Sequence, residues 1–229
     1  MSERKKNQLV FNRIKVLSSK KQKDYASEMM SHPYSEEEGW GYTDVLQIDG
    51  SINATLQKRI STYYNVWNDE LQQVERQCFQ IVAEIPFELD LNRFILMAEG
   101  TNIQLNRVKQ SFRQVFWNEF VYEDINLMPV DYINMLQKSG KLLAIGELTI
   151  NDFLYEGCLI GRYNAKPTSQ INIIEKFGEH VRRIIRAKLK IDLVGEECIL
   201  CVSNKNVMTL ESTVDAKVEL VNYMKAYLV

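Results

Sequence analysis

The sequence predicts an α+β protein in which a long heptad-patterned helix and several further helices pack on short antiparallel strands and hairpins. Apolar residues recur at alternating gaps of four and three residues between positions 60 and 85, a repeat typical of helices wound against a partner. Helix start and stop residues bracket several later segments. Short strand-like runs in the C-terminal half are separated by turn residues rather than by crossover helices.

The composition is typical of a soluble globular protein. The chain has 229 residues, of which 45% are hydrophobic and 25% charged, enough for one substantial core or two small ones. No apolar run approaches the roughly 20 residues that span a bilayer, and the N-terminus has no stretch typical of a signal peptide. We therefore expect a cytoplasmic protein without membrane contact.

Charge divides the N-terminal part of the chain. The formal net charge of −2 argues against a globally basic nucleic-acid binder, yet residues 1–30 carry eight Lys or Arg and residues 31–50 carry five acids and no base. The basic segment either folds back on the acidic one or reaches a polyanion. We expect residues 1–50 to form an N-terminal segment, with a mobile loop at 31–51 where proline and glycine are frequent, and residues 51–229 to form a single α+β domain.

The predicted long helix runs from about residue 52 to residue 85 and ends before Pro86, since the residue before a proline avoids helical backbone. Its partner is either the aromatic helix expected at 102–122, a second copy of the chain or another protein. Such a helix is about 50 Å long, so part of it projects unless something covers it. The residues expected at this interface are Ile60, Tyr64, Trp67, Leu71 and Val74.

The other elements follow from local signals. Thr101 and Gln104 have capping-box spacing before the aromatic helix, and Pro129 and Gly140 bracket a short one. The remaining expected elements are a strand at 93–98, strands at 141–150 and 155–163, a helix from about 169 to 191, strands at 198–203 and 207–212, and a helix at 214–228.

Basic residues form one candidate site. Read as a helix, residues 169–191 carry an apolar face and an opposite basic stripe, which can lie along phosphates. The alternative is a solvated face whose acids near the start and bases near the end suit the helix dipole. The residues expected to contact nucleic acid are Arg182, Arg183, Arg186 and Lys190 of this helix, together with Lys20, Lys21 and Lys23.

A carboxylate pair is the second candidate. If Asn151 and Asp152 form a two-residue turn, Glu147 lies directly across from Glu156, and facing carboxylates need a metal, a shared proton or a cation. If residues 151–154 form a four-residue loop, Glu147 faces Cys158 and the pair disappears. In that case the residues form a solvated strand face.

Known enzyme motifs are absent from the sequence. It contains no nucleophile elbow, P-loop or dinucleotide fingerprint, and only two histidines. Cys198 and Cys201 are half of a zinc site without a second pair of ligands, so we expect no metal and no cofactor.

We therefore expect a non-enzymatic subunit of an intracellular protein assembly. It would associate with a protein partner or a second copy through the helix at 52–85, and its basic surfaces would contact nucleic acid or an acidic partner. The alternative is a metal-dependent phosphodiesterase or nuclease that uses Glu147 and Glu156.

Overall fold

The computed structural model describes residues 4–155, 159–167, 178–204 and 207–228, and it is mostly antiparallel sheet. Strand accounts for 54% of the structure and helix for 26%. Within the described ranges there are eleven strands and four α-helices, and the longest of these helices has 15 residues. The predicted α+β fold built around a long heptad helix is therefore wrong.

The segment expected to form the long helix is instead a β-hairpin. Strand β3 (Ser51–Asn68) and strand β4 (Gln73–Asp90) pair with each other over their full length. The segment is rich in β-branched and aromatic residues, which favour strands. Its core end also alternates, with Ile52, Ala54 and Leu56 buried and their neighbours partly exposed. The heptad spacing of the apolar residues is therefore coincidental, and the strand propensity and the alternation of buried residues determine the structure of this segment.

The chain divides into two compact units. Residues 14–98 and 106–121 form one, called the arm unit below, and residues 1–13, 99–105 and 122–229 form the other, called the C-terminal unit. The boundary expected near residue 50 lies inside the arm unit, at the turn between β2 and β3. Asp49 and Gly50 form this turn with φ angles of 40° and 90°, as a two-residue hairpin turn requires.

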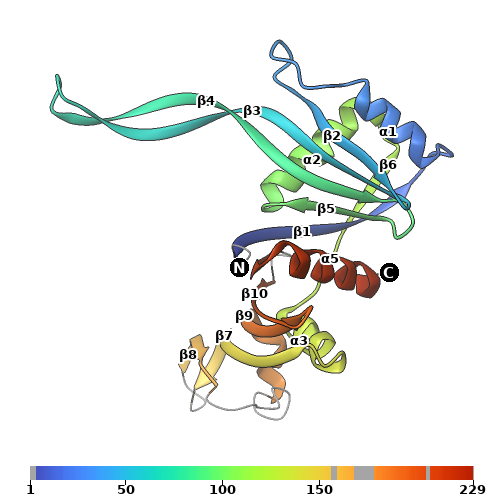
Figure 1. Cartoon of the computed structure of the whole chain (residues 1–229). Helices are drawn as coiled ribbons and strands as arrows, with labels where there is room; N and C mark the ends of the chain where they lie inside the picture. Colours follow the sequence, from blue (N-terminus) through green and yellow to red (C-terminus); the bar gives the residue numbers. More distant parts are fainter. Residues whose placement is uncertain (1–3, 156–158, 168–177, 205–206, 229) are drawn as a thin grey trace. The chain divides into compact units, whose positions relative to one another are not determined.

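The arm unit contains strands in the order β2-β3-β4-β5, with helices packed against them (Figure 1). Its further elements are β2 (Trp40–Ile48), β5 (Ile95–Glu99), helix α1 (Gln22–Met30) and most of helix α2 (Asn102–Phe116). Tyr25, Phe112, Phe116 and Phe120 form its aromatic core, with ring centroids 5.2 to 5.6 Å apart. On the sheet side, Phe87 stacks edge-on against Phe112 at 5.4 Å.

The C-terminal unit contains antiparallel strands in the order β1-β11-β10-β9-β7-β8. Strand β1 (Lys5–Val16) ends in the arm unit, and strand β6 (Phe120–Asp124) begins there. The further elements of the C-terminal unit are helix α3 (Pro129–Lys138), β7 (Leu142–Tyr155), β8 (Leu159–Ala165), the 3₁₀-helix η1 (Gly178–Arg183), β9 (Ile184–Leu193), β10 (Glu196–Ser203), β11 (Val207–Ser212) and helix α5 (Val214–Leu228). Helices α3 and α5 contact β9 and bury their own apolar residues, so they cover one face of this sheet. On the opposite face of β9, Arg186, Lys188 and Lys190 are exposed.

Several capped elements are confirmed. Thr101 and Gln104 form the predicted capping contact, because the Thr101 N–H donates to the Gln104 side chain at 3.0 Å and the Ile103 N–H donates to the Thr101 hydroxyl at 3.3 Å. The helix that follows ends at Phe116 rather than near 122. Helices α3 and α5 and strands β10 and β11 lie where the sequence predicts them.

The basic helix predicted at 169–191 is wrong. Residues 178–183 form η1 and residues 184–193 form β9, while residues 168–177 lie outside the described part of the chain. Ala187, Leu189 and Ile191 are buried, and the basic residues between them are exposed. This alternation has a period of two, so it is a strand pattern.

The structure contains neither of the two hairpin registers considered for the residues near 150. Strand β7 continues through Asn151 and Asp152, and its pairing shifts between Ile150 and Phe153. Phe153 pairs with Gly161, and Tyr155 pairs with Leu159. Neither the two-residue turn nor the loop at 151–154 forms, and Glu156 lies outside the described residues.

Truncating the aromatic core should unfold the arm unit at lower denaturant concentration. Phe112 is fully buried, so we expect Phe112→Ala to lower the free energy of unfolding by about 3–5 kcal/mol. Gln114→Ala, at an exposed position of the same helix, should change it by less than about 0.5 kcal/mol. Urea titration followed by circular dichroism checks both values, and similar effects for the two variants would contradict this core.

Helix α3 contains a titratable group that links stability to pH. Burial raises the pKa of Tyr132 to about 12, and Asp131 adds to the shift. An unfolded tyrosine loses its proton near pH 10. The contribution of the neutral, buried Tyr132 to the free energy of unfolding is therefore complete below about pH 10 and is lost as the pH rises toward about 12. We expect Tyr132→Phe to lose less stability than the native chain between about pH 9 and about pH 11. Urea titrations at the two pH values measure this, and equal losses would contradict it.

Candidate functional site

The β3–β4 hairpin extends beyond the strands that flank it. Strand β2 pairs with β3 only as far as Lys58, and β5 pairs with β4 only from Phe87 onward. Within the described strands, residues 59–68 therefore pair only with residues 73–82, and residues 83–86 pair with residues 55–58 and with no strand on their outer side. Figure 1 shows this part of β3 and β4 running out past the rest of the arm unit. We call residues 59–86 the arm.

The tip of the arm is held by its own polar groups. Residues 69–72 connect the strands, and the side-chain oxygen of Asn68 accepts hydrogen bonds from the N–H groups of Glu70 at 3.0 Å and Leu71 at 3.2 Å. The Asn68 amide also donates to Glu75 across the hairpin at 3.0 Å. The ladder runs to this turn without a bulge, so each side chain keeps its face along the whole arm.

Both faces of the arm expose large apolar side chains. One face continues the core side of the sheet and carries Ile60, Tyr64, Phe79 and Ile81. The ring centroids of Tyr64 and Phe79 lie 5.7 Å apart. The opposite face carries Tyr63, Trp67, Val74 and Val82. Tyr64 and Trp67 are 55% and 52% exposed, so nothing in the arm unit covers them. All five residues expected at an interface lie on the arm, namely Ile60, Tyr64, Trp67, Leu71 and Val74.

The outer edge of β3 presents unpaired backbone groups. Arg59 donates its N–H to the Gly39 carbonyl at 2.7 Å, away from β4. Because alternate residues of a regular strand point their N–H and C=O to the same side, residues 61, 63, 65 and 67 present theirs outward as well. Strand β2 ends its pairing at Lys58, so no described strand meets them.

The two outer edges of the arm differ in their chemistry. The edge of β4 begins at Pro86, which has no N–H to offer a further strand. Residues 60–68 of β3 contain neither proline nor any charged residue. The β3 edge is therefore the better template for another strand.

The N-terminal lysines expected to contact nucleic acid lie in and before α1. Lys20 pairs with Glu28 at 2.7 Å and with Glu119 at 2.6 Å, and these hydrogen bonds raise its pKa above the usual value. Lys21 is the N-cap of α1, and Lys23 is exposed in its first turn. Lys20 is thus committed to contacts within its own unit.

The C-terminal basic residues are dispersed in the same way. Arg182 is exposed on η1, and Arg183 donates to the Asp152 carbonyl at 2.7 Å. Lys190 pairs with Glu197 at 2.9 Å, whereas Arg186 points from β9 into a depression of the open sheet face.

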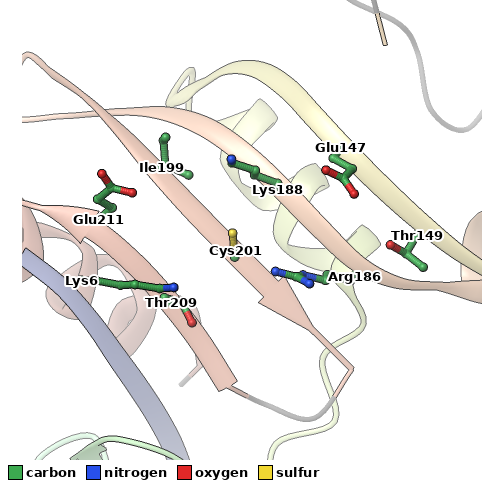
Figure 2. A pocket seen from close by; sticks show the side chains of 9 residues that line it. All are labelled: Lys6, Glu147, Thr149, Arg186, Lys188, Ile199, Cys201, Thr209 and Glu211. Atoms are coloured by element: carbon green, nitrogen blue, oxygen red, sulfur yellow. The ribbon is translucent and has the colours of Figure 1, made fainter. Parts of the chain in front are cut away.

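This depression, called the sheet hollow below, lies over β1, β11, β10, β9 and β7 and has a volume of about 240 Å³. Figure 2 shows Arg186 directed toward Cys201 on the central strand, the amine of Lys188 lying over the same strand between Ile199 and Cys201, and the amine of Lys6 reaching Thr209. The lining residues are Lys6, Glu147, Thr149, Arg186, Lys188, Ile199, Cys201, Thr209 and Glu211.

Strand register explains how the hollow is assembled. Lys188 lies between Glu147 on one neighbouring strand and Cys201 on the other. Arg186 lies beside Thr149, and Lys6 lies beside Glu211. In the described residues, none of the three cations forms an ion pair within 4.0 Å.

The carboxylates of the hollow do not form a metal site with each other. Glu147 and Glu211 lie three strand spacings apart, about 14 Å, which is too far to share one ion. Across the described ranges no group of three or more His, Cys, Asp or Glu could hold a metal ion. Glu156, the other member of the predicted carboxylate pair, lies outside these ranges.

Lys6, Lys188 and both threonines of the hollow were not among the residues predicted from the sequence. Lys188 alternates with buried residues between Arg186 and Lys190, and this period-two pattern was the available signal. The position of Lys6 beside Glu211 depends on pairing between the two ends of the chain, which has no local signal.

The described cysteines are all free thiols in different environments. Cys78 is exposed on the arm, and Cys201 is half-buried in the hollow. Cys198 is buried on the other face of β10, and its burial raises the thiol's pKa. The described helices include none that is long and apolar enough to cross a membrane.

No protein-family model matches this chain, and no curated protein matches it in sequence. The arguments for its function therefore come from the arm and the hollow themselves.

Proposed function

We propose that this chain is a non-enzymatic subunit of a protein assembly and that two copies associate through the outer edge of β3 in the arm. One observation carries the proposal. Among the described strands, none pairs with the outer edge of about nine residues that the arm presents, and that stretch has no charge and no proline.

The exposed arm favours association. A two-stranded hairpin alone is marginally stable in water, and the arm exposes large apolar side chains on both faces. Natural proteins protect free edges with lysines, prolines or bulges, since a bare edge recruits other strands. Residues 60–68 have none of these protections, so a further strand would stabilise the arm.

A second copy fits this edge better than an arbitrary partner. Two β3 edges related by a two-fold axis pair antiparallel, and each contributes the same residues. Such symmetric pairing places a segment opposite itself, and like charges would then oppose each other. The segment from Ile60 to Asn68 is uncharged, so no repulsion arises, and it provides a ladder about 30 Å long.

The free thiols support a reducing compartment such as the cytoplasm. Cys78, Cys198 and Cys201 form no disulfide, and an exposed thiol such as Cys78 persists where the environment is reducing. We therefore propose that the assembly is intracellular.

Proline at one outward-facing position should separate the copies. In Asn65→Pro the lost N–H is one that points away from β4, so the hairpin keeps its internal hydrogen bonds while the outer edge is blocked. We expect the native chain to have twice the mass of one chain by size-exclusion chromatography with light scattering at micromolar concentration. Asn65→Pro should have the mass of a single chain.

Asn65→Ala is the matched control, because it shortens the same exposed side chain but keeps the N–H, and it should remain dimeric. Circular dichroism verifies that both variants keep their strand content. A monomeric native chain, or a dimer that persists in Asn65→Pro, would overturn the proposal. A native chain that is monomeric would direct the search to a different protein partner.

A further inference from the structure

We infer that the sheet hollow of the C-terminal unit is a binding site for a phosphate group, carried by a small phosphorylated compound. This site is independent of the arm and of the association proposed for it, because every lining residue belongs to the C-terminal unit.

The cations of the hollow remain available for a ligand. Lys190 lies on the same strand face as Arg186 and Lys188 and closes an ion pair with Glu197 at 2.9 Å. Arg186 and Lys188 form no such pair in the described residues, although Glu147 lies on the neighbouring strand beside Lys188. The hollow thus contains cations that form no ion pair with its own carboxylates in the described residues.

The charges around the hollow leave an excess beside Arg186. Lys188 has Glu147 in register, and Lys6 has Glu211 in register, so each lysine is partly offset by a carboxylate. Arg186 has Thr149 in register instead, which carries no charge. A planar guanidinium binds two phosphate oxygens at once, which makes Arg186 the natural centre of an anion site.

Neutral donors complete the arrangement. Thr149 lies beside Arg186 on the neighbouring strand and can add a hydroxyl donor next to the guanidinium. Thr209 lies beside Cys201 on the other side of the hollow, three strand spacings or about 14 Å from Thr149, so it would reach only the far end of a larger group such as a diphosphate. Hydroxyl groups donate hydrogen bonds to phosphate oxygens without adding charge. The sheet beneath the hollow is backed by buried apolar residues such as Leu200, and a wall of low dielectric strengthens charge interactions at its surface.

The volume of the hollow and the chemistry of its lining residues indicate which kind of ligand fits it. At about 240 Å³ it is smaller than the sites that enclose drug-sized molecules, which start at roughly 300 Å³. None of its nine described lining residues is aromatic, so it offers no ring on which a nucleobase can stack. A phosphate or diphosphate group fits this chemistry better than a nucleoside or a single-stranded nucleic acid.

Cys201 provides a direct test, because a phosphate bound among the three cations would cover its thiol. The purified chain is alkylated with iodoacetamide with and without pyrophosphate, with sodium chloride added to equal ionic strength. Mass spectrometry of the cysteine peptides then gives a rate for each thiol. We expect pyrophosphate to slow alkylation of Cys201 at least several-fold and to leave Cys78 on the arm unchanged.

The variants test the assignment of Arg186. Arg186→Gln should abolish the protection by pyrophosphate, while Arg182→Gln, which removes an exposed arginine outside the lining, should keep it. Inorganic phosphate and a single-stranded oligonucleotide serve as further probes. Protection by pyrophosphate or phosphate at concentrations where the oligonucleotide gives none would support a small phosphorylated ligand.

Three outcomes would overturn the inference. One is equal alkylation of Cys201 with and without phosphate compounds. Another is protection that survives in Arg186→Gln. Protection by the oligonucleotide alone would overturn the small-ligand assignment and identify the hollow as a contact for a nucleic-acid backbone, with a salt dependence that measures the phosphates engaged.

Discussion

The ladder between β3 and β4 determines how the arm unit is built and what it presents to solvent. Its 18 consecutive pairs contain no bulge, so a side chain that faces the core at one end defines the same face at the other. Ile85, Phe87 and Leu89 are buried where helices and further strands meet this face. The flanking strands stop pairing before the ladder ends, and the continuing apolar face then lies in water.

The same rule of alternation leads to a different surface in the C-terminal unit. There the helices α3 and α5 take the apolar side of the sheet, and the residues between the buried positions of β9 are basic. Neighbouring strands add hydroxyls and carboxylates in register with them. Alternation thus produces a polar hollow in the C-terminal unit and an apolar arm in the arm unit, because the residues between the buried positions differ.

Capped helices and the last strands could be predicted from the sequence because their signals are local. The capping pair Thr101 and Gln104 and the proline at 129 act within one turn of helix. The segment at 52–85 is ambiguous in the sequence, because its apolar residues fit a helical heptad as well as two strands joined by a turn. The Asp49–Gly50 turn, a strong hairpin signal, and the β-branched residues around Ile60 were the better guides. The hollow could not be predicted, since Lys6 joins it through pairing over some 200 residues.

The arm edge and the sheet hollow each lack the groups that the other surface has. This difference favours a different kind of partner for each of them. The arm edge has backbone donors and acceptors and apolar side chains but no charge between residues 60 and 68, so it lacks the cations that attract a phosphate. The hollow has three cations but no aromatic ring among its described lining residues and no free strand edge, so it has no means to hold another strand. The ligand proposed for the hollow and the second copy proposed for the arm therefore rely on different chemistry, and each surface can be altered by substitution without removing the chemistry of the other.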